Sequence, residues 1–393
     1  MLVAFTIVVL GGMGSFAGAL AGGLLIGVVE SLGGLFLGDS LGQMGIFAIF
    51  ILVLLFRPQG LFGESMNTSV KDACAILAFG LAVLAITGFT QSGVLLTFIM
   101  MSLYAALLSQ AWNILGGYGG QLSFGHALFF GVGAYAQALG QLSLGWNPWL
   151  ALPCAIALGM AAGLAVGGLT FRYGLRGSYF ALVTLAFAEV LRIVATSVSF
   201  TGGGVGLMLP LREVATNMQF PSRHGYIHLI LAFVLLALAV TAWLRRSRFG
   251  AYLQAVRDNE DAARAIGVDP LRVKLGGIAL SAAFMSATGA FYVQVFQYID
   301  PAIAFGPAVS VEALVGAIVG GMGTLWGPVL GALALHALAD LTRNLFGELP
   351  GISMVIYGVV LILIVTFAPR GISGCGQSAA RLFKRPARRA LEK

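Results

Sequence analysis

The chain has 393 residues and a net charge of +7, with 59% hydrophobic and only 9% charged residues. Its mean hydropathy of +0.95 excludes an ordinary soluble domain, which could not bury that much apolar surface, and indicates a polytopic membrane protein. The basic excess requires no nucleic acid: residues 381–389 (RLFKRPARR) are better explained as a topology anchor or a contact with lipid headgroups. Cys74, Cys154 and Cys375 are too scattered for a disulfide framework or a metal site.

Apolar runs long enough to cross a bilayer, about 20 residues each, recur along the chain between charged or Gly/Pro-rich breaks. They predict an all-α, polytopic helical membrane protein, with about ten transmembrane helices in the main part and two or so before residue 63. The expected spans are 15–37, 42–56, 73–90, 94–115, 121–142, 149–171, 178–200, 226–244, 273–298, 308–319, 325–345 and 352–367.

The loops between these spans agree on one orientation. If the polar segment 245–274 is inside, strict alternation also places 57–72, 172–176 and 370–393 inside, so the C-terminus is expected in the cytoplasm. The long segment 201–225 then lies outside. Only ten residues precede Gly11, too few for a span, and no signal peptide is recognisable, so we expect a truncated or misplaced start.

Part of the chain occurs twice. VVLGGMGSFAGALAGGLLIGVVESL at 8–32 recurs as AIVGGMGTLWGPVLGALALHALADL at 317–341, and RPQGLFG at 57–63 recurs as APRGISG at 368–374. One membrane unit is therefore expected to end near Gly63 and a second to follow it. The predicted domains are a truncated fragment at 1–63, a linker at 64–72, the main membrane domain at 73–374 and a basic cytoplasmic tail at 375–393.

The most polar stretch, 245–274, holds seven of the 22 basic residues and is expected in the cytoplasm. Within it, Asp258 can cap a short helix whose first turn holds Glu260 and Asp261. Gly267 can end that helix in a left-handed turn, and the proline that follows blocks its continuation.

Ala262 and Ile266, four residues apart, would give this short helix one small apolar face. The spacing alone favours an ordinary amphipathic loop helix and leaves a docking element for a soluble partner as the second interpretation.

Two apolar segments are interrupted by glycines. GGMG, with Gly320, Gly321 and Gly323, predicts either a tight turn between closely packed helices or a backbone break that lines a cavity. It is no phosphate-binding loop, because no lysine follows and G-x-x-x-x-G-K-[ST] occurs nowhere in the chain. Any nucleotide would therefore bind to another subunit.

In the second segment, 116–135, Ser123 and His126 are expected to share one helix face. His126 could sense protons or contact a polar ligand, although a histidine bonded to backbone at a helix start is the commoner arrangement. A single histidine without partners makes no metal site.

Ionisable side chains within spans are costly and usually face a cavity or one another. Glu189 and Arg192, three residues apart, fit an intrahelical ion pair and a place on a translocation path equally well. Glu312, like His336 and Asp340, raises the same question, but these three are too scattered for a proton relay. Outside the spans, Gly202 and Gly203 of FTGGGVGL suit either a loop close to a substrate or partner, or a flexible connector. The candidate residues for the translocation path are therefore Ser123, His126, Glu189, Arg192, Gly202 and Gly203.

Five segments, in this order, resemble the inner-membrane permeases of branched-chain amino acid ABC importers of the LivM type. They are QLSFGHALFFGVGAY (121–135), YFALVTLAFAEVLR (179–192), TGGGVGL (201–207), QAVRDNEDAARAIGVDPLRVK (254–274) and residues 320–371. The resemblance covers residues 70–374, and residues 1–63 resemble the C-terminal end of the sister permease, LivH.

The resemblance implies a permease subunit without catalytic residues or a cofactor of its own, which translocates branched-chain or related small amino acids across the inner membrane. Its implied partners are a LivH-like permease, two cytoplasmic ATPase subunits and a periplasmic substrate-binding protein. The helix 258–267 would be the coupling helix that enters the ATPase, with Glu260, Ala262, Ala263 and Gly267 as matching positions. Asp258, its expected cap, is counted with these coupling residues. Gly202 and Gly203 match an outer TGG motif of the family. The next two residues, Gly204 and Val205, differ from the more polar residues usual after that motif.

Two alternatives remain open. Relatives of this family import urea, short amides or aromatic acids, so the substrate is less specified than the class. A stand-alone secondary transporter driven by an ion gradient is the alternative from a different class; it would require paired intramembrane acids or a broken-helix ion site.

Overall fold

The computed structural model describes residues 68–211 and 214–346, with isolated helical residues nearer the two ends. The chain divides into two compact units, Met1–Ala75 and Ile76–Lys393. Among the described residues, seven helices are long and apolar enough to cross a membrane, and the only strands have two residues each. The prediction of an all-α, multi-pass membrane protein is confirmed, whereas the expected spans 15–37, 42–56 and 352–367 lie outside the continuously described segments.

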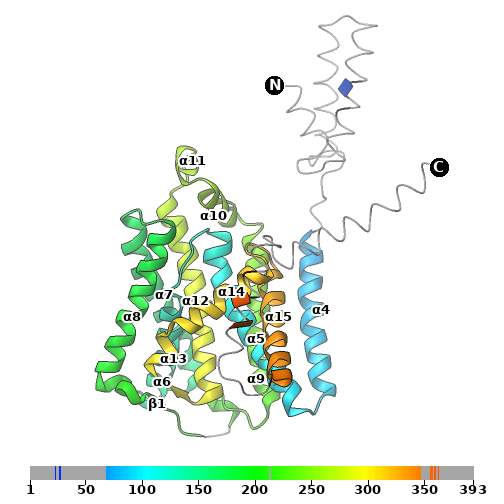
Figure 1. Ribbon diagram of the computed structural model, residues 1–393, viewed down its shortest axis with the longest axis vertical. Coiled ribbons are helices and arrows are strands. Elements are labelled where there is room, and N and C mark those ends of the chain that lie inside the picture. The colour runs from blue at the N-terminus through cyan, green and yellow to red at the C-terminus, as the bar shows by residue number, and fades with distance from the viewer. Residues whose placement is uncertain are drawn as a thin grey trace, which may run out of the picture. The chain divides into compact units, whose positions relative to one another are not determined.

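The elements follow the hydropathy of the sequence closely. In chain order they are α4 Thr68–Phe89, α5 Gly93–Asn113, a π-helical turn Ile114–Tyr118, α6 His126–Leu142, α7 Pro148–Arg172, α8 Gly177–Ser197, β1 Leu207–Met208, α9 Arg223–Leu244, α10 Arg248–Asp258, α11 Glu260–Ala265, α12 Pro270–Phe296, β2 Tyr298–Ile299, α13 Pro301–Phe305, α14 Pro307–Gly320 and α15 Gly327–Phe346. The helices α10 and α11 lie at one end of the bundle, and β1 lies at the other (Figure 1). We refer to these as the α10–α11 end and the β1–β2 end.

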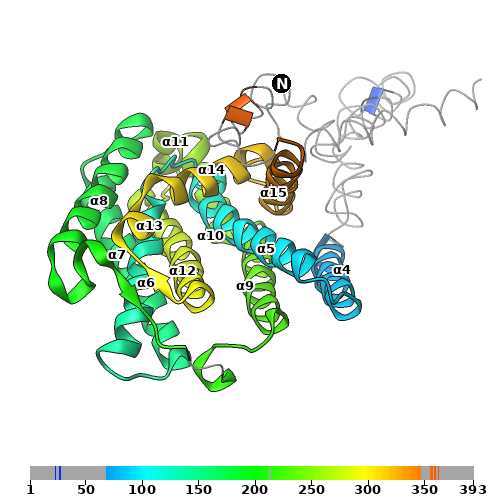
Figure 2. The ribbon, with the colours of Figure 1, turned by 60° about the horizontal axis from the view of Figure 1, so that its bottom comes forward.

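The central helix is α12, which packs against α5, α6, α7 and α9 (Figure 2). Small residues make this close packing possible: a Cβ on Gly133 of α6 would collide with the backbone of Ser286, and one on Gly289 with the backbone of Phe130. In a membrane, where lipid offers no hydrophobic drive for association, such close backbone contact supplies much of the attraction between helices. The core of this unit is therefore built from glycine and serine as well as from large apolar side chains.

The GGMG segment forms a turn between closely packed helices, the first of the two interpretations given for it. Gly321 and Gly323 take positive φ values of 115° and 72°, which place α15 alongside α14. A Cβ on Gly320 would collide with the carbonyl oxygen of Gly327, so the two backbones touch where the turn closes.

Two expected helix starts are wrong. The span expected from Gln121 begins at His126, because residues 120–125 form an irregular segment in which the Ser123 carbonyl oxygen accepts a hydrogen bond from Trp112 Nε1 (2.8 Å). Ser123 therefore precedes the helix, and it does not share a helix face with His126. Asp258 does not cap α11; it is the last residue of α10.

Candidate functional site

The α10–α11 end is built on two well-formed helix caps. The Asn259 side chain accepts from the backbone N–H groups of Asp261 (3.1 Å) and Ala262 (3.0 Å), and so performs the capping role expected of Asp258. Gly267 has φ +89° and its N–H bonds to the Arg264 carbonyl oxygen, which gives the left-handed turn that the sequence predicts. Asp269 then caps α12, with Pro270 at its first position.

Glu260 anchors α11 to the rest of the bundle. Its carboxylate binds Lys274 Nζ of α12 (2.6 Å), Arg176 Nε just before α8 (3.1 Å) and Arg264 Nη2 of α11 itself (3.5 Å). Lys274 is only 4% exposed in its side chain and lies over the Phe171 ring at 5.5 Å from the centroid. A buried lysine requires such a counterion, so this network fixes the position of α11 relative to both α12 and the α7–α8 loop.

The outward surface of α11 is apolar at its tip. Ile266 is 78% exposed, and Ala262 is exposed beside it, whereas Ala263 is buried against the bundle. Of the coupling positions named from the sequence, Glu260 and Ala263 therefore hold the helix in place. Ala262, Gly267 and the adjacent Ile266 are the ones that a partner could reach.

A second set of contacts joins α10 to both glycine-broken segments. Arg257 Nη1 donates to the Gly117 carbonyl oxygen in the π-helical turn (3.0 Å). Asn113 is fully buried: its Oδ1 accepts from Gly323 N (2.8 Å) and its Nδ2 donates to the Thr324 carbonyl oxygen (3.1 Å). A Cβ on Gly117 would come within 2.5 Å of Gly323 N, so only glycine permits this approach. We call these four residues, Asn113, Gly117, Arg257 and Gly323, the glycine junction.

His126 and Ser123 lie inside the bundle. The His126 ring is fully buried and its Nε2 lies 2.9 Å from Ser281 Oγ, which itself donates to the Ala111 carbonyl oxygen (2.6 Å). Because the Ser281 proton is already used, Nε2 is the donor in this pair. Ser123 Oγ lies 3.3 Å from Thr184 Oγ1. Both side chains thus join elements of the bundle, and His126 Nε2 bonds to the side chain of Ser281 on α12.

Glu189 and Arg192 form the intrahelical ion pair that was one of two interpretations. Arg192 donates from Nε to Oε2 (2.9 Å) and from Nη2 to Oε1 (2.5 Å). Both side chains are half-exposed, and Arg192 lies four residues after the buried Ala188, at the edge of the face by which α8 packs on the bundle. Each charge therefore has its partner within one helix.

The TGG loop closes the β1–β2 end. Gly202 and Gly203 have positive φ values of 77° and 57°, and a Cβ on Gly202 would collide with the carbonyl oxygen of Gly206. The loop leads into β1, which pairs antiparallel with β2 through Leu207–Ile299 and Met208–Tyr298. The glycines thus shape a compact loop, and its Gly206 packs closely against Ile299 and Asp300 just before α13.

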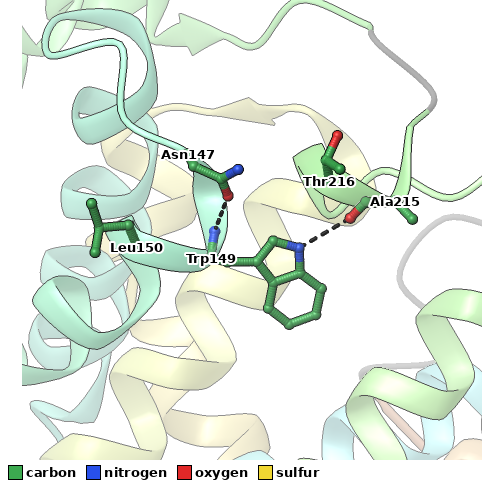
Figure 3. Close-up of a pocket in the computed structure, with 5 residues that line it drawn as sticks. All are labelled: Asn147, Trp149, Leu150, Ala215 and Thr216. Atoms are coloured by element: carbon green, nitrogen blue, oxygen red, sulfur yellow. Dashed lines mark hydrogen bonds between the residues drawn. The ribbon is translucent and has the colours of Figure 1, made fainter.

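One hollow of about 600 Å³ opens near the same end (Figure 3). Polar groups in its lining form hydrogen bonds with one another: Trp149 Nε1 donates to the Ala215 carbonyl oxygen (3.0 Å), and Asn147 Oδ1 accepts from Trp149 N (2.9 Å). Its remaining lining is mostly apolar, with Leu150 and Thr216. This hollow lies apart from both the α10–α11 network and the glycine junction.

The residues named from the sequence thus fall into separate places. Asp258, Glu260, Ala262, Ala263 and Gly267 lie together at the α10–α11 end, and the GGMG glycines come close to them through Arg257. The six path candidates do not converge: Ser123 and His126 are internal, Glu189 and Arg192 lie on α8, and Gly202 and Gly203 lie at the β1–β2 end. Sequence reasoning missed four residues that hold the site together, Asn113, Arg176, Arg257 and Lys274.

Within residues 68–211 and 214–346, no group of three or more His, Cys, Asp or Glu side chains is placed to hold a metal ion. A multi-pass helical bundle that carries a charged helical loop at one end and glycine-packed helices in its middle belongs to the class of polytopic helical membrane proteins. The comparisons with known proteins specify the class further.

The family described as "Branched-chain amino acid transport system / permease component" matches residues 94–365. The high-affinity branched-chain amino acid transport system permease protein LivM of Salmonella typhimurium is 30% identical over 69% of this chain and 68% of its own length. The chain therefore belongs to this permease family, as the resemblance predicted. No solved structure matches.

The N-terminal stretch has different relatives. Over 61 residues, 16% of this chain, it is 53% identical to the branched-chain amino acid transport system permease protein BraD of Pseudomonas aeruginosa and covers 20% of that protein. LivH of Escherichia coli is 46% identical over the same length. The expected resemblance of this stretch to LivH is confirmed.

Proposed function

We propose that the chain is the permease subunit of an ATP-driven importer that moves branched-chain or related small amino acids across the cell inner membrane. The family and the names of its relatives support a transport subunit for this class of substrate. The observation that carries the proposal is α11, a short helix anchored by Glu260 with the exposed apolar tip of Ile266. The exposed Ile266 and Ala262 give this charged segment an apolar contact point for a protein partner.

The partners are those that the resemblance to branched-chain amino acid importers implies. Two separate cytoplasmic ATPase subunits that receive α11 would hydrolyse ATP, consistent with the lack of a G-x-x-x-x-G-K-[ST] motif in the sequence. A LivH-like permease would complete the membrane part, and a periplasmic binding protein would deliver the amino acid at the β1–β2 end. In this arrangement the α10–α11 end and the C-terminus face the cytoplasm.

The contacts of α11 and α10 suggest how ATPase closure would reach the membrane. A displacement of α11 acts through Glu260 on Lys274 of α12 and on Arg176 before α8. A displacement of α10 acts through Arg257 on the glycine junction, and thus on the turn between α14 and α15. The α10–α11 segment is therefore joined by polar bonds to α12 and to the loop before α8, and through the glycine junction to the end of α5 and the turn between α14 and α15.

The test compares two exposed apolar positions at opposite ends of the helical bundle. Ile266→Ser should abolish co-purification of the ATPase subunits and ATP-dependent uptake of radiolabelled leucine into vesicles, because the docking tip becomes polar. Val205→Ser, at an 82% exposed position of the TGG loop, is the matched control and should retain both ATPase binding and assembly. Equal ATPase binding by the two variants would refute the role of α11.

The same vesicles distinguish the alternative class. Uptake by the purified chain without ATPase subunits, driven by an ion gradient, would indicate a secondary transporter instead of a subunit of an ATP-driven importer.

A further inference from the structure

The loop between α7 and α8 is confined to the membrane surface by its length. Both helices are candidate membrane spans, Pro148–Arg172 and Gly177–Ser197, and only residues 173–176 join them. Arg176, the last residue of the loop, binds Glu260 of α11, so the loop lies at the α10–α11 end. A connection this short cannot extend far from the bilayer surface. Its side chains are therefore within reach of lipid headgroups.

The packed and the exposed sides of α7 differ in the size of their side chains. Gly159 and Gly163 face α12, where a Cβ would collide with the side chain of Ser286 or Ala282. The exposed side is bulky instead and includes Leu158, Leu164 and Leu169. Helix interfaces in membranes favour small residues, so the bulky side suits lipid chains better than another helix.

The helix α8 shows the same division, and it is the outermost helix on its side of the bundle in both views (Figures 1 and 2). Glu189 and Arg192, at the edge of its exposed side, neutralise each other by their ion pair. Its exposed apolar residues recur at helical spacing and are Leu182, Ala186, Val190 and Ile193. The exposed apolar sides of α7 and α8 thus meet at the α7–α8 loop.

Arginine and tyrosine occupy the positions where these apolar sides reach the loop. Arg172 follows Leu169 by three residues and is exposed; among the residues that the structure describes, it has no ion-pair or hydrogen-bond partner. Tyr173 and Tyr179 are 78% and 74% exposed. Tyrosine is enriched at membrane–water interfaces, where its apolar ring and polar hydroxyl are both solvated. An arginine stem can lie along apolar surface while its guanidinium reaches the headgroups.

We propose that the α7–α8 loop binds the headgroup of an anionic phospholipid such as phosphatidylglycerol. Arg172 donates to the phosphate, Tyr173 and Tyr179 lie at the level of the headgroup, and the acyl chains follow the exposed leucines. The guanidinium fork matches phosphate oxygens, and a lipid with net negative charge is attracted more strongly than a zwitterionic one. The proposal holds whatever solute the permease transports.

The test uses the full chain in vesicles of phosphatidylcholine and phosphatidylglycerol. Photoreactive forms of the two lipids, each with a diazirine near the top of one acyl chain, are cross-linked to the protein, and the modified residues are mapped by mass spectrometry. Phosphatidylglycerol should label residues 169–182 several times more than phosphatidylcholine. Arg172→Gln should lower this preference about fivefold, the contribution of one arginine near an anionic membrane surface. Arg172→Lys keeps the charge and should retain most of the preference.

Arg272→Gln is the matched control. It removes the same charge at the same end of the bundle, from a side chain that is 88% exposed and pairs with Asp269. It should leave the preference for phosphatidylglycerol unchanged. Equal labelling of the wild type by both lipids would refute the proposal, and so would an equal preference in Arg172→Gln and Arg272→Gln.

Two further measurements distinguish other occupants of this surface. Inorganic phosphate should not reduce the labelling, because it lacks acyl chains; full competition would assign the loop to a soluble anion and overturn the proposal. Assembly of the complete transporter should leave the labelling in place. Its loss with both lipids would show that the partner permease covers this side of α7 and α8, and the proposal would be wrong.

Discussion

At the scale of single residues, the buried bond between Lys274 and Glu260 makes the firmest prediction. Lys274→Met keeps the length of the side chain but leaves Glu260 partly buried without its shortest contact, so unfolding should become easier by about 3 kcal/mol. The thermal midpoint of the purified protein in detergent measures this. Arg272→Met is the matched control: its pair with Asp269 is 88% exposed on the arginine side and should contribute about 1 kcal/mol or less. Equal midpoints for the two variants would contradict a structural role of the buried pair.

The same residues show what the sequence can predict at this scale and what it cannot. The left-handed turn at Gly267 follows from local chemistry, and the structure has it. Which of Asp258 and Asn259 caps α11 depends on where α10 ends. Both residue types are good helix caps, so the sequence alone does not decide between them. The inward position of Glu260 depends on Arg176 and Lys274, which are distant in sequence, so no spacing rule could reveal it.

At the scale of elements, hydropathy predicts helix ends well only where polar residues bound them. The end of α9 at Leu244, just before two arginines, agrees with the sequence. The sequence predicts a helix start at Gln121, whereas α6 begins at His126. The residues between them include no charged side chain, so hydropathy gives no sign that the helix has not yet begun. The π-helical turn at Ile114–Tyr118 has no sequence signal of its own: it arises where glycines let α5 approach the GGMG turn.

The turn at Gly267 gives the prediction for the α10–α11 element. A Cβ at this position meets no atom within 4 Å, so only the positive φ opposes substitution. Gly267→Val should distort the turn, because a β-branched residue disfavours this conformation by about 1–2 kcal/mol, and leucine uptake should fall while the protein stays in the membrane. Gly267→Asn, which adopts the left-handed conformation more readily, is the control and should keep most of the activity. ATP hydrolysis measured on the same vesicles separates uncoupling from lost assembly, and normal uptake by Gly267→Val would contradict the coupling role of this turn.

At the scale of the whole molecule, the two ends of the bundle differ in their charge. The α10–α11 end collects the basic residues of the segment 245–274 and of the α7–α8 loop, including Arg176 and Arg264. The β1–β2 end presents apolar residues instead, among them Val205 and Met208, which are 82% and 78% exposed. An excess of lysine and arginine in short loops marks the cytoplasmic side of a membrane protein, so this asymmetry predicts the orientation of the bundle formed by the described helices.

Labelling of single cysteines tests that orientation. With Cys74, Cys154 and Cys375 replaced by serine, Arg264→Cys should react with a membrane-impermeant maleimide in inside-out vesicles. It should stay unlabelled in intact cells whose outer membrane has been made permeable to the reagent. Val205→Cys should show the reverse, since both positions are exposed and differ only in the end of the bundle where they lie. The reversed pattern would place α11 outside the cell, beyond the reach of any cytoplasmic ATPase. It would therefore refute the orientation and, with it, the route by which ATP hydrolysis is proposed to drive this permease.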